Sequence, residues 1–166
     1  MLVREMDRPE CQELLMRVGF GRLACSRENQ PYIVPIYFAV DQDCLYGFAT
    51  VGQKIEWMRE NPAVCVEVDE VKNHIQWASV VVVGRYEEFP DVPANSEQRR
   101  LAEALLEKRA LWWQTAFGAA QTRGNLNRDI PVIFRIRGTR ITGRRASPDP
   151  VEESLGASPA RTGAKL

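Results

Sequence analysis

The chain has 166 residues, of which 45% are hydrophobic, and its 22 basic and 22 acidic side chains give a formal net charge of zero. This length suits one ordinary core and leaves little room for a second domain. Because there is no overall positive field, neither a nucleic acid nor an anionic membrane is expected as a partner. The N-terminus has no apolar run that could act as a signal peptide and no later stretch could span a bilayer, which predicts a cytoplasmic protein.

The cysteines and the single histidine argue against metal and triad chemistry. Cys11, Cys25, Cys44 and Cys65 are far apart, and no Cys-x-x-Cys pair is present. They are typical of reduced core residues. Because His74 is the only histidine, neither a zinc site of the usual Cys/His type nor a Ser-His-Asp hydrolase is favoured. We expect no metal site.

The first third of the chain predicts one helix followed by an antiparallel meander. Asp7 and Glu10 have the spacing of a capping box and Gly19 suits a C-cap, so a helix is expected between them. Short apolar segments separated by turn residues then predict strands at 20–26, 32–40 and 44–49. The second of these is almost wholly apolar and should be covered on both faces, with Pro35 marking a bulge or an unpaired position.

The remaining chain continues this pattern. A short helix is predicted from Gly52 to just before Pro62, because the residue ahead of a proline is disfavoured in helical geometry. Further elements are a strand at 63–68, a polar connector at 69–73, a long central strand at 75–89, a helix at 96–117 and strands at 131–137 and 140–144. The buried face of the second long helix is predicted to carry Leu101, Ala104, Leu105, Leu111 and Trp112.

The C-terminal 21 residues differ in composition from the rest. From Ala146 onward the chain is rich in Pro, Ser, Ala and Gly and has few large apolar groups, so 146–166 is predicted to be a disordered tail. Residues 1–145 are predicted to form one domain of about seven short strands with helices beside them. Without a βαβ rhythm, the fold class is mainly β with flanking helices, a small antiparallel barrel.

Several segments together carry a resemblance to a known family. They are Gly21-Arg22-Leu23-Ala24, the runs 30–38 and 45–50, Gly52-Gln53-Lys54-Ile55-Glu56, and the runs 61–68 and 77–85. In this order and spacing the chain resembles the pyridoxamine 5′-phosphate oxidase-like flavoproteins, and within them the nitroimidazole-resistance branch. The resemblance implies an FMN-binding split β-barrel that works as a homodimer, with FMN at two sites between the subunits.

The resemblance also assigns cofactor-binding positions. It places the strand residues Val34, Pro35, Ile36 and Tyr37, together with Ala49 and Thr50, along the flavin ring and ribityl chain, Gln53 and Lys54 at the phosphate, and Ser79 facing the ring. The adjacent Trp112 and Trp113 cannot both face inward on one helix. One is expected in the core and the other at the flavin pocket or the partner chain, a role that we assign to Trp113.

Lys54 has a physical argument of its own. A Gly-Gln-Lys sequence that opens a helix brings free backbone N–H groups, the positive end of the helix dipole and an ammonium group to one place, which suits a phosphate. The alternative is a solvated surface lysine. Arginines near the C-terminus, including Arg140 and Arg144, are predicted to form one solvated face, with Arg144 alternatively approaching the flavin phosphate across the dimer.

These assignments predict a flavin-dependent oxidoreductase that passes electrons from a donor to a small-molecule acceptor such as a nitroaromatic compound. No catalytic side chain is assigned. His74 is the one candidate, as a proton donor, against the alternative of an exposed loop histidine. The alternative function is a non-catalytic module that binds a flavin or a haem, for which His74 is the only histidine ligand available. The substrate motif of the pyridoxamine phosphate oxidases is not recognisable near the C-terminus, so that specific activity is not predicted.

Overall fold

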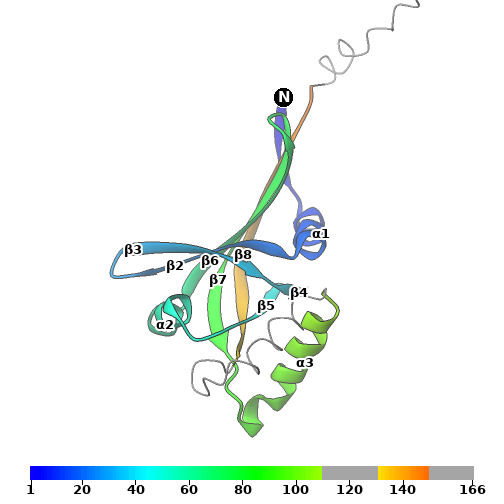
Figure 1. The fold of residues 1–166 in the computed structure, drawn as a ribbon. Helices are drawn as coiled ribbons and strands as arrows, with labels where there is room; N and C mark the ends of the chain where they lie inside the picture. The colour runs from blue at the N-terminus through cyan, green and yellow to red at the C-terminus, as the bar shows by residue number, and fades with distance from the viewer. Residues whose placement is uncertain (110–130, 150–166) are drawn as a thin grey trace, which may run out of the picture.

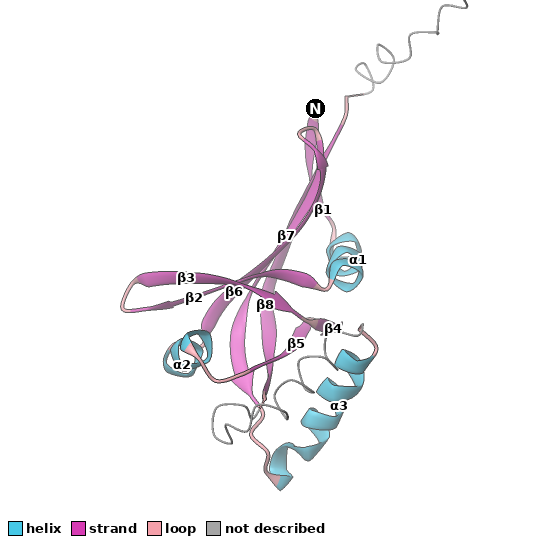
Figure 2. Ribbon diagram, viewed as in Figure 1, coloured by secondary structure: helices cyan, strands magenta, loops and turns pink. Residues whose placement is uncertain are grey.

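The computed structural model describes residues 1–109 and 131–149. Within these ranges the chain forms an eight-stranded antiparallel sheet with helices packed beside it (Figures 1 and 2). The strand order is β3-β2-β6-β7-β8-β5-β4, and β1 also pairs with β8. This is the predicted fold class. The expectations for Leu111, Trp112 and Trp113, and for 150–166, lie outside the described residues.

The elements follow one another in this order along the chain. They are β1 (Leu2–Met6), α1 (Arg8–Val18), β2 (Phe20–Arg27), β3 (Gln30–Tyr37), β4 (Ala39–Asp41), β5 (Cys44–Ala49), α2 (Gln53–Glu60), β6 (Ala63–Asn73), β7 (Gln76–Glu88), a 3₁₀ turn at Pro93–Asn95, α3 (Ser96–Glu107) and β8 (Val132–Ser147). No helix among the described residues is long and apolar enough to cross a membrane.

Helix α1 forms as its sequence predicts. The Asp7 carboxylate accepts a hydrogen bond from the Glu10 backbone N–H at 2.9 Å, and the Glu10 carboxylate accepts one from the Asp7 N–H at 3.1 Å. Gly19 ends the helix with φ of 61°, a left-handed conformation that glycine adopts at little cost. Its buried face, with Leu14 and Leu15, packs into the core of the sheet.

The apolar segment after the first hairpin turn is less buried than predicted. It divides into β3 and β4 at Phe38, and β3 is an edge strand that pairs only with β2 among the described strands. The side chains of Ile33 and Tyr37 are 63% and 47% exposed, so the expectation of cover on both faces is wrong for the single chain. Pro35 sits in regular register with Arg22. A proline is tolerated there because the other edge of β3 needs no ladder donor.

Two strands are longer than predicted because pairing continues through polar residues. The predicted connector at 69–73 belongs to β6, which pairs with β7 as far as Asn73 and Gln76. The predicted strands at 131–137 and 140–144 are one strand, β8. Its irregular register around Gly138 absorbs one extra residue, and the Thr139 hydroxyl there donates to the Val83 carbonyl at 3.1 Å.

The predicted tail begins too early. Strand β8 runs to Ser147, and Ala146, which is 2% exposed, pairs with Val3 on one side and Trp77 on the other. Ser147 pairs with Leu2 of β1. Residues 146 and 147 therefore belong to the sheet, because neighbouring strands supply hydrogen-bond partners for their backbone groups.

The buried face of α3 also differs from the prediction. Ala102 and Leu106 are fully buried, whereas Leu101 and Ala104 are exposed. Leu105 is partly buried against a small second core cluster that includes Phe89, Ala102 and Ile133. The buried stripe lies about one residue away from the predicted one, because leucine and alanine occur on both sides of this helix and hydrophobicity alone does not identify the buried side.

The central strands separate two faces of the sheet. Alternate residues Val64, Val66 and Val68 of β6 and Val80 and Val82 of β7 point into the core. Paired residues on antiparallel strands point the same way, so the residues between them lie on the opposite face, here called the outer face. It carries Cys65, Glu67 and Asp69 of β6, Trp77, Ser79, Val81 and Val83 of β7, and Arg140, Thr142 and Arg144 of β8.

Candidate functional site

A hollow of about 230 Å³ lies where the end of β3 meets β5 and the start of α2. We call it the Lys54 hollow. Its walls are Phe20, Pro35, Ile36, Tyr37, Phe48 and Lys54. It therefore combines an apolar and aromatic lining with a single cation, the composition of a site that orients a largely flat ligand through one charged group.

The N-terminus of α2 is open toward solvent. Gly52 is its N-cap in an extended conformation, and no side chain caps the first turn. A Cβ atom at Gly52 would meet nothing within 4 Å. The first N–H groups of a helix have no partner within the helix, so this end presents donors and the positive end of the helix dipole to a ligand.

Lys54 is a half-buried cation in this open turn. Burial lowers its pKa from the usual value, and the Cys25 thiol is the one nearby group that acts in the opposite direction. No carboxylate of the described residues forms an ion pair with Lys54. An anion entering the Lys54 hollow would supply the missing counter-charge and favour the ammonium form.

The aromatic wall comes from neighbouring strands. The rings of Phe20 and Tyr37 lie 4.7 Å apart between centroids with a tilt of 53°, and these residues are directly paired across β2 and β3. No described strand pairs with the outer edge of β3, so the backbone N–H and C=O groups of that edge lie outside the described ladder along this wall. Hydrogen bonds from such groups can orient the polar edge of an aromatic ring system.

The structure brings together four of the residues that the sequence assigned to the cofactor, namely Pro35, Ile36, Tyr37 and Lys54. The others are placed differently. Val34 is partly buried against the core, Ala49 is buried and paired with Val132, Thr50 is exposed after β5, and Gln53 is exposed at the first position of α2. Trp113 lies outside the described residues.

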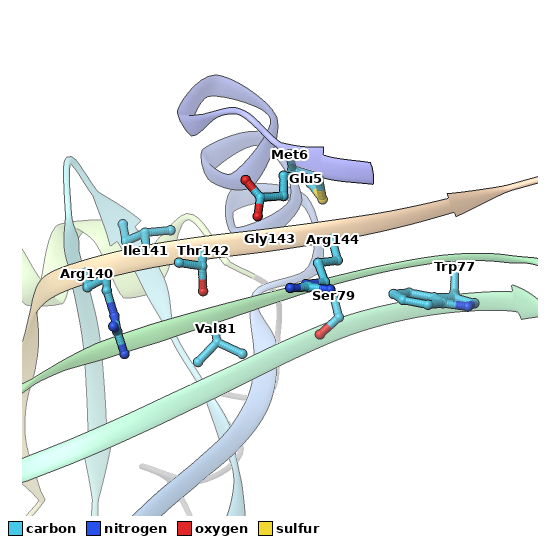
Figure 3. Close-up of a pocket in the computed structure, with 10 residues that line it drawn as sticks. All are labelled: Glu5, Met6, Trp77, Ser79, Val81, Arg140, Ile141, Thr142, Gly143 and Arg144. Carbon is cyan, nitrogen blue, oxygen red and sulfur yellow. The ribbon is translucent and has the colours of Figure 1, made fainter. Parts of the chain in front are cut away.

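Ser79 lies in a second hollow, on the outer face (Figure 3). This outer-face hollow has a volume of about 610 Å³ and lies over β7, β8 and the end of β1. The Ser79 hydroxyl donates to the Glu67 carboxylate at 2.8 Å, and Arg22 contacts the other oxygen of that carboxylate at 3.2 Å. Ser79 and Lys54 thus line different hollows of one chain.

His74 is not part of either hollow. It lies exposed in the turn that joins β6 to β7. Figure 1 shows that this turn is the tip of a long hairpin. This is the position expected for an exposed loop histidine. Within the described ranges, no group of three or more His, Cys, Asp or Glu side chains is arranged to hold a metal ion.

Phe20, Phe48, Arg140 and Thr142 each line one of the hollows, although no site role is predicted for them from the sequence. Alternation along β2 was a usable signal for Phe20, since Gly21 and Leu23 point inward. For Arg140 and Thr142 the available signal was strand alternation, which places them on the same face of β8 as Arg144.

Comparison with known proteins identifies the family. The sequence profile of a family described as Pyridoxamine 5′-phosphate oxidase matches residues 7–145. An uncharacterized protein of Rhizobium meliloti is 40% identical over 146 residues, 88% of this chain and 97% of that protein. The crystal structure of a FAD-binding protein from Mesorhizobium loti has a TM-score of 0.71 and 42% identity, covering 89% of this chain and 99% of that one.

The nitroimidazole-resistance branch has weaker support. A structure from Bacteroides thetaiotaomicron, described as a candidate 5-nitroimidazole antibiotic resistance protein, is 18% identical with a TM-score of 0.62, covering 89% of this chain and 93% of that one. A likeness at this level shows the shared fold alone, so assignment to that branch stays a prediction.

Proposed function

The chain belongs to the pyridoxamine 5′-phosphate oxidase family, and we propose that it binds a flavin whose phosphate lies at the start of α2, beside Lys54. The observation that carries this proposal is a half-buried ammonium group without an ion-pair partner among the described residues, set in a helix turn that no side chain caps. A phosphate would satisfy both the charge and the N–H donors.

The shape of the Lys54 hollow supports a flavin over a simple anion. Phe20, Tyr37 and Phe48 give it an aromatic lining, and the open edge of β3 presents backbone hydrogen-bonding groups beside that lining. An inorganic anion would use the cation and leave the apolar walls without a partner. A flavin uses both, because its phosphate is joined to a flat, polar-edged ring.

FMN is the proposed cofactor, and FAD is the alternative that the comparison raises. The Mesorhizobium loti protein, at 42% identity, is a FAD-binding protein. Both flavins carry a phosphate next to the ribityl chain, so Lys54 serves either. The Lys54 hollow, at about 230 Å³, is smaller than the roughly 300–1,000 Å³ typical of small-molecule sites, and it holds only part of either molecule.

A flavin supplies one- and two-electron chemistry, and the protein orients it and controls access. The proposed activity is therefore transfer of electrons from a donor to a small-molecule acceptor, nitroaromatic compounds included. In the Lys54 hollow, Lys54 and Tyr37 are the titratable lining residues. Neither is assigned a catalytic role, and they are proposed to bind and position the cofactor.

The haem alternative fits the geometry less well. His74 is the only histidine of the chain, and it is exposed at the hairpin tip, outside both hollows. A haem in either hollow would need an axial ligand other than histidine from the same chain. A module that binds flavin without turnover remains the second candidate, since the Mesorhizobium loti relative is described by binding alone.

A homodimer is proposed from the apolar surface beside the Lys54 hollow. Phe20, Ile33 and Tyr37 are large exposed hydrophobic residues on β2 and β3, and Phe20 and Tyr37 also line the hollow. A second copy seated there would cover an apolar patch and add a wall to the cofactor site. Flavin binding and association would then be linked, each strengthening the other.

The phosphate assignment is tested by titrating FMN, FAD and riboflavin into wild type and Lys54→Met. Loss of a charge-assisted hydrogen bond predicts that FMN and FAD affinity falls about 10- to 150-fold, while riboflavin, which lacks the phosphate, is unaffected. Lys72→Met, at an exposed position of β6, is the matched control. Unchanged FMN affinity, or an equal loss for riboflavin, would show that Lys54 does not hold the phosphate.

Two measurements test the remaining assignments. Mass spectrometry of the ligand released from protein purified without added cofactor distinguishes FMN from FAD. Bleaching of the bound flavin by a nicotinamide donor, followed by reoxidation with an acceptor, supports an enzyme, whereas a flavin that is never reduced supports a binding module. The dimer is tested by analytical ultracentrifugation. Ile33→Glu should dissociate the dimer into monomers that have lost their flavin. Gln30→Glu on the same strand should remain a dimer with flavin bound.

A further inference from the structure

The outer-face hollow has features that the proposed flavin phosphate site does not use. Arg140, Thr142 and Arg144 are alternate residues of β8, so their side chains lie on one face of the strand. Thr142 is paired with Val81 and Arg144 with Ser79 on β7, and the next residue on that face of β7 is Trp77. Figure 3 shows Trp77 at one end of the hollow and Arg140 at the other.

Two arginines in this hollow form no ion pair with an acidic residue of the part of the chain that the structure describes. Among the described residues no carboxylate forms an ion pair with Arg140 or Arg144, although Glu5 lies in the hollow and is paired with Arg144 across β1 and β8. Other arginines of β8 differ. Arg137 contacts Glu87 at 2.9 Å, and Arg145 lies 4.0 Å from Glu10. The hollow therefore presents two free guanidinium groups, with the Thr142 hydroxyl between them.

The aromatic group lies at a useful distance from these cations. Trp77 is half-buried. Thr142 is paired with Val81, four residues from Trp77 along β7, which corresponds to about 13 Å at the usual strand rise. A ligand stacked on the indole could thus reach the space between the two arginines with an anionic group. A planar base joined to a short chain of phosphates matches this arrangement.

We infer that the outer-face hollow binds the adenosine diphosphate group of a dinucleotide. The diphosphate lies between Arg140 and Arg144 and accepts a hydrogen bond from the Thr142 hydroxyl, and the adenine stacks on Trp77. The volume of about 610 Å³ lies in the range of small-molecule sites. The zero net charge of the chain disfavours a nucleic acid strand as the occupant.

Nicotinamide dinucleotides, which donate electrons to flavins, carry this group whole. FAD is not the proposed source, because one phosphate of its ADP group is the riboflavin phosphate that the proposed function places beside Lys54. The inference goes beyond the proposed flavin site, because ADP itself carries every atom that the outer-face hollow is argued to recognise. Its failure is therefore separable from failure of the Lys54 site.

The test is isothermal titration of ADP, AMP and adenosine into the purified full-length protein. Saturable ADP binding is expected, weaker for AMP and weakest for adenosine. Arg140→Ala and Arg144→Ala should each weaken ADP on the order of tenfold, and Trp77→Ala should weaken all three ligands. Arg85→Ala, an exposed position of β7 outside the hollow, is the matched control and should bind ADP as wild type does.

Further arms identify the source of the group. NADH or NADPH should compete with ADP for the hollow, and Arg144→Ala should weaken NADH or NADPH while leaving FMN unchanged. Lys54→Met should weaken FMN without changing ADP. Absence of saturable ADP binding to folded wild type, or an equal effect of Arg85→Ala and Arg144→Ala, would overturn the inference. Thermal melting confirms that each variant is folded.

Discussion

The N-termini of α1 and α2 show two uses of the same structural element. In α1 the first turn is closed by its own side chains, because Asp7 and Glu10 satisfy each other's backbone N–H groups. Arg4 in turn contacts the Glu10 carboxylate at 2.7 Å. In α2 the cap is Gly52, no side chain closes the turn, and the half-buried Lys54 has no ion-pair partner among the described residues.

The two helix starts therefore differ in what they contribute: a capped turn adds stability, and an uncapped turn can bind a ligand. A capped turn stabilises the helix by about 0.5–2 kcal/mol, whereas an uncapped turn leaves donors for a ligand at the cost of that stabilisation. Glu10, the third residue of α1, therefore serves structure, whereas Lys54, the second residue of α2, is proposed to serve binding. The comparison predicts that changes to α1 alter folding and leave flavin affinity intact, and that changes at the start of α2 do the reverse.

The largest effect is expected from the buried face of α1. Leu14 is fully buried in the main core, so Leu14→Ala should lower the free energy of unfolding by about 2–5 kcal/mol. Urea denaturation measures this loss, and Glu13→Ala, an exposed neighbour, is the control. If the folded fraction of Leu14→Ala bound flavin more weakly than wild type, α1 would not be purely structural.

The next effect is a pH dependence of flavin binding. Burial lowers the pKa of Lys54 before binding, and a bound phosphate raises it again because it favours the ammonium form. Affinity should therefore be constant below the lowered pKa and fall as the pH rises through it, toward the 10- to 150-fold loss expected of Lys54→Met. Titrations at increasing pH measure this, and Lys54→Arg, which stays charged, should remove the decline. A decline of equal size for riboflavin would contradict the assignment.

A smaller effect is expected at the α1 cap. Asp7→Ala removes the acceptor of the Glu10 N–H and should lower the free energy of unfolding by about 1 kcal/mol. Asp7→Ser restores an acceptor and should recover most of that loss. Thermal or urea unfolding measures the free energy of unfolding of each variant. The affinity for FMN should stay at the wild-type value in both variants.

The smallest change in stability is expected at the α2 cap, where a substitution that stabilises the helix should weaken FMN binding. Gly52 has an extended backbone and free space around its missing Cβ, so Gly52→Asp should be tolerated. Its carboxylate would cap the first turn and stabilise the protein by roughly 0.5 kcal/mol. The same carboxylate would occupy the phosphate donors and repel the phosphate, weakening FMN. Gly52→Ala is the control, and tighter FMN binding by Gly52→Asp would contradict the open-turn interpretation.

The sequence by itself determined the elements whose signals are local. The capping box and C-cap glycine gave the bounds of α1, Pro62 gave the end of α2, and β5 begins and ends where its apolar run does. The motif resemblance also identified the family. These features succeed because they depend on residues only a few positions apart, whose backbone preferences act before any tertiary contact forms.

Tertiary structure alone decided how far strands extend and which faces remain open. The polar segment at 69–73 became strand because β7 supplies its hydrogen bonds, and the apolar β3 stayed exposed because the described chain places no strand on its outer edge. The meeting of Tyr37 with Lys54, and the separation of Ser79 from both, follow from the same pairings. Burial depends on partners distant in sequence. A hydrophobic pattern indicates which side chains are apolar, but it does not indicate which element, if any, packs over them.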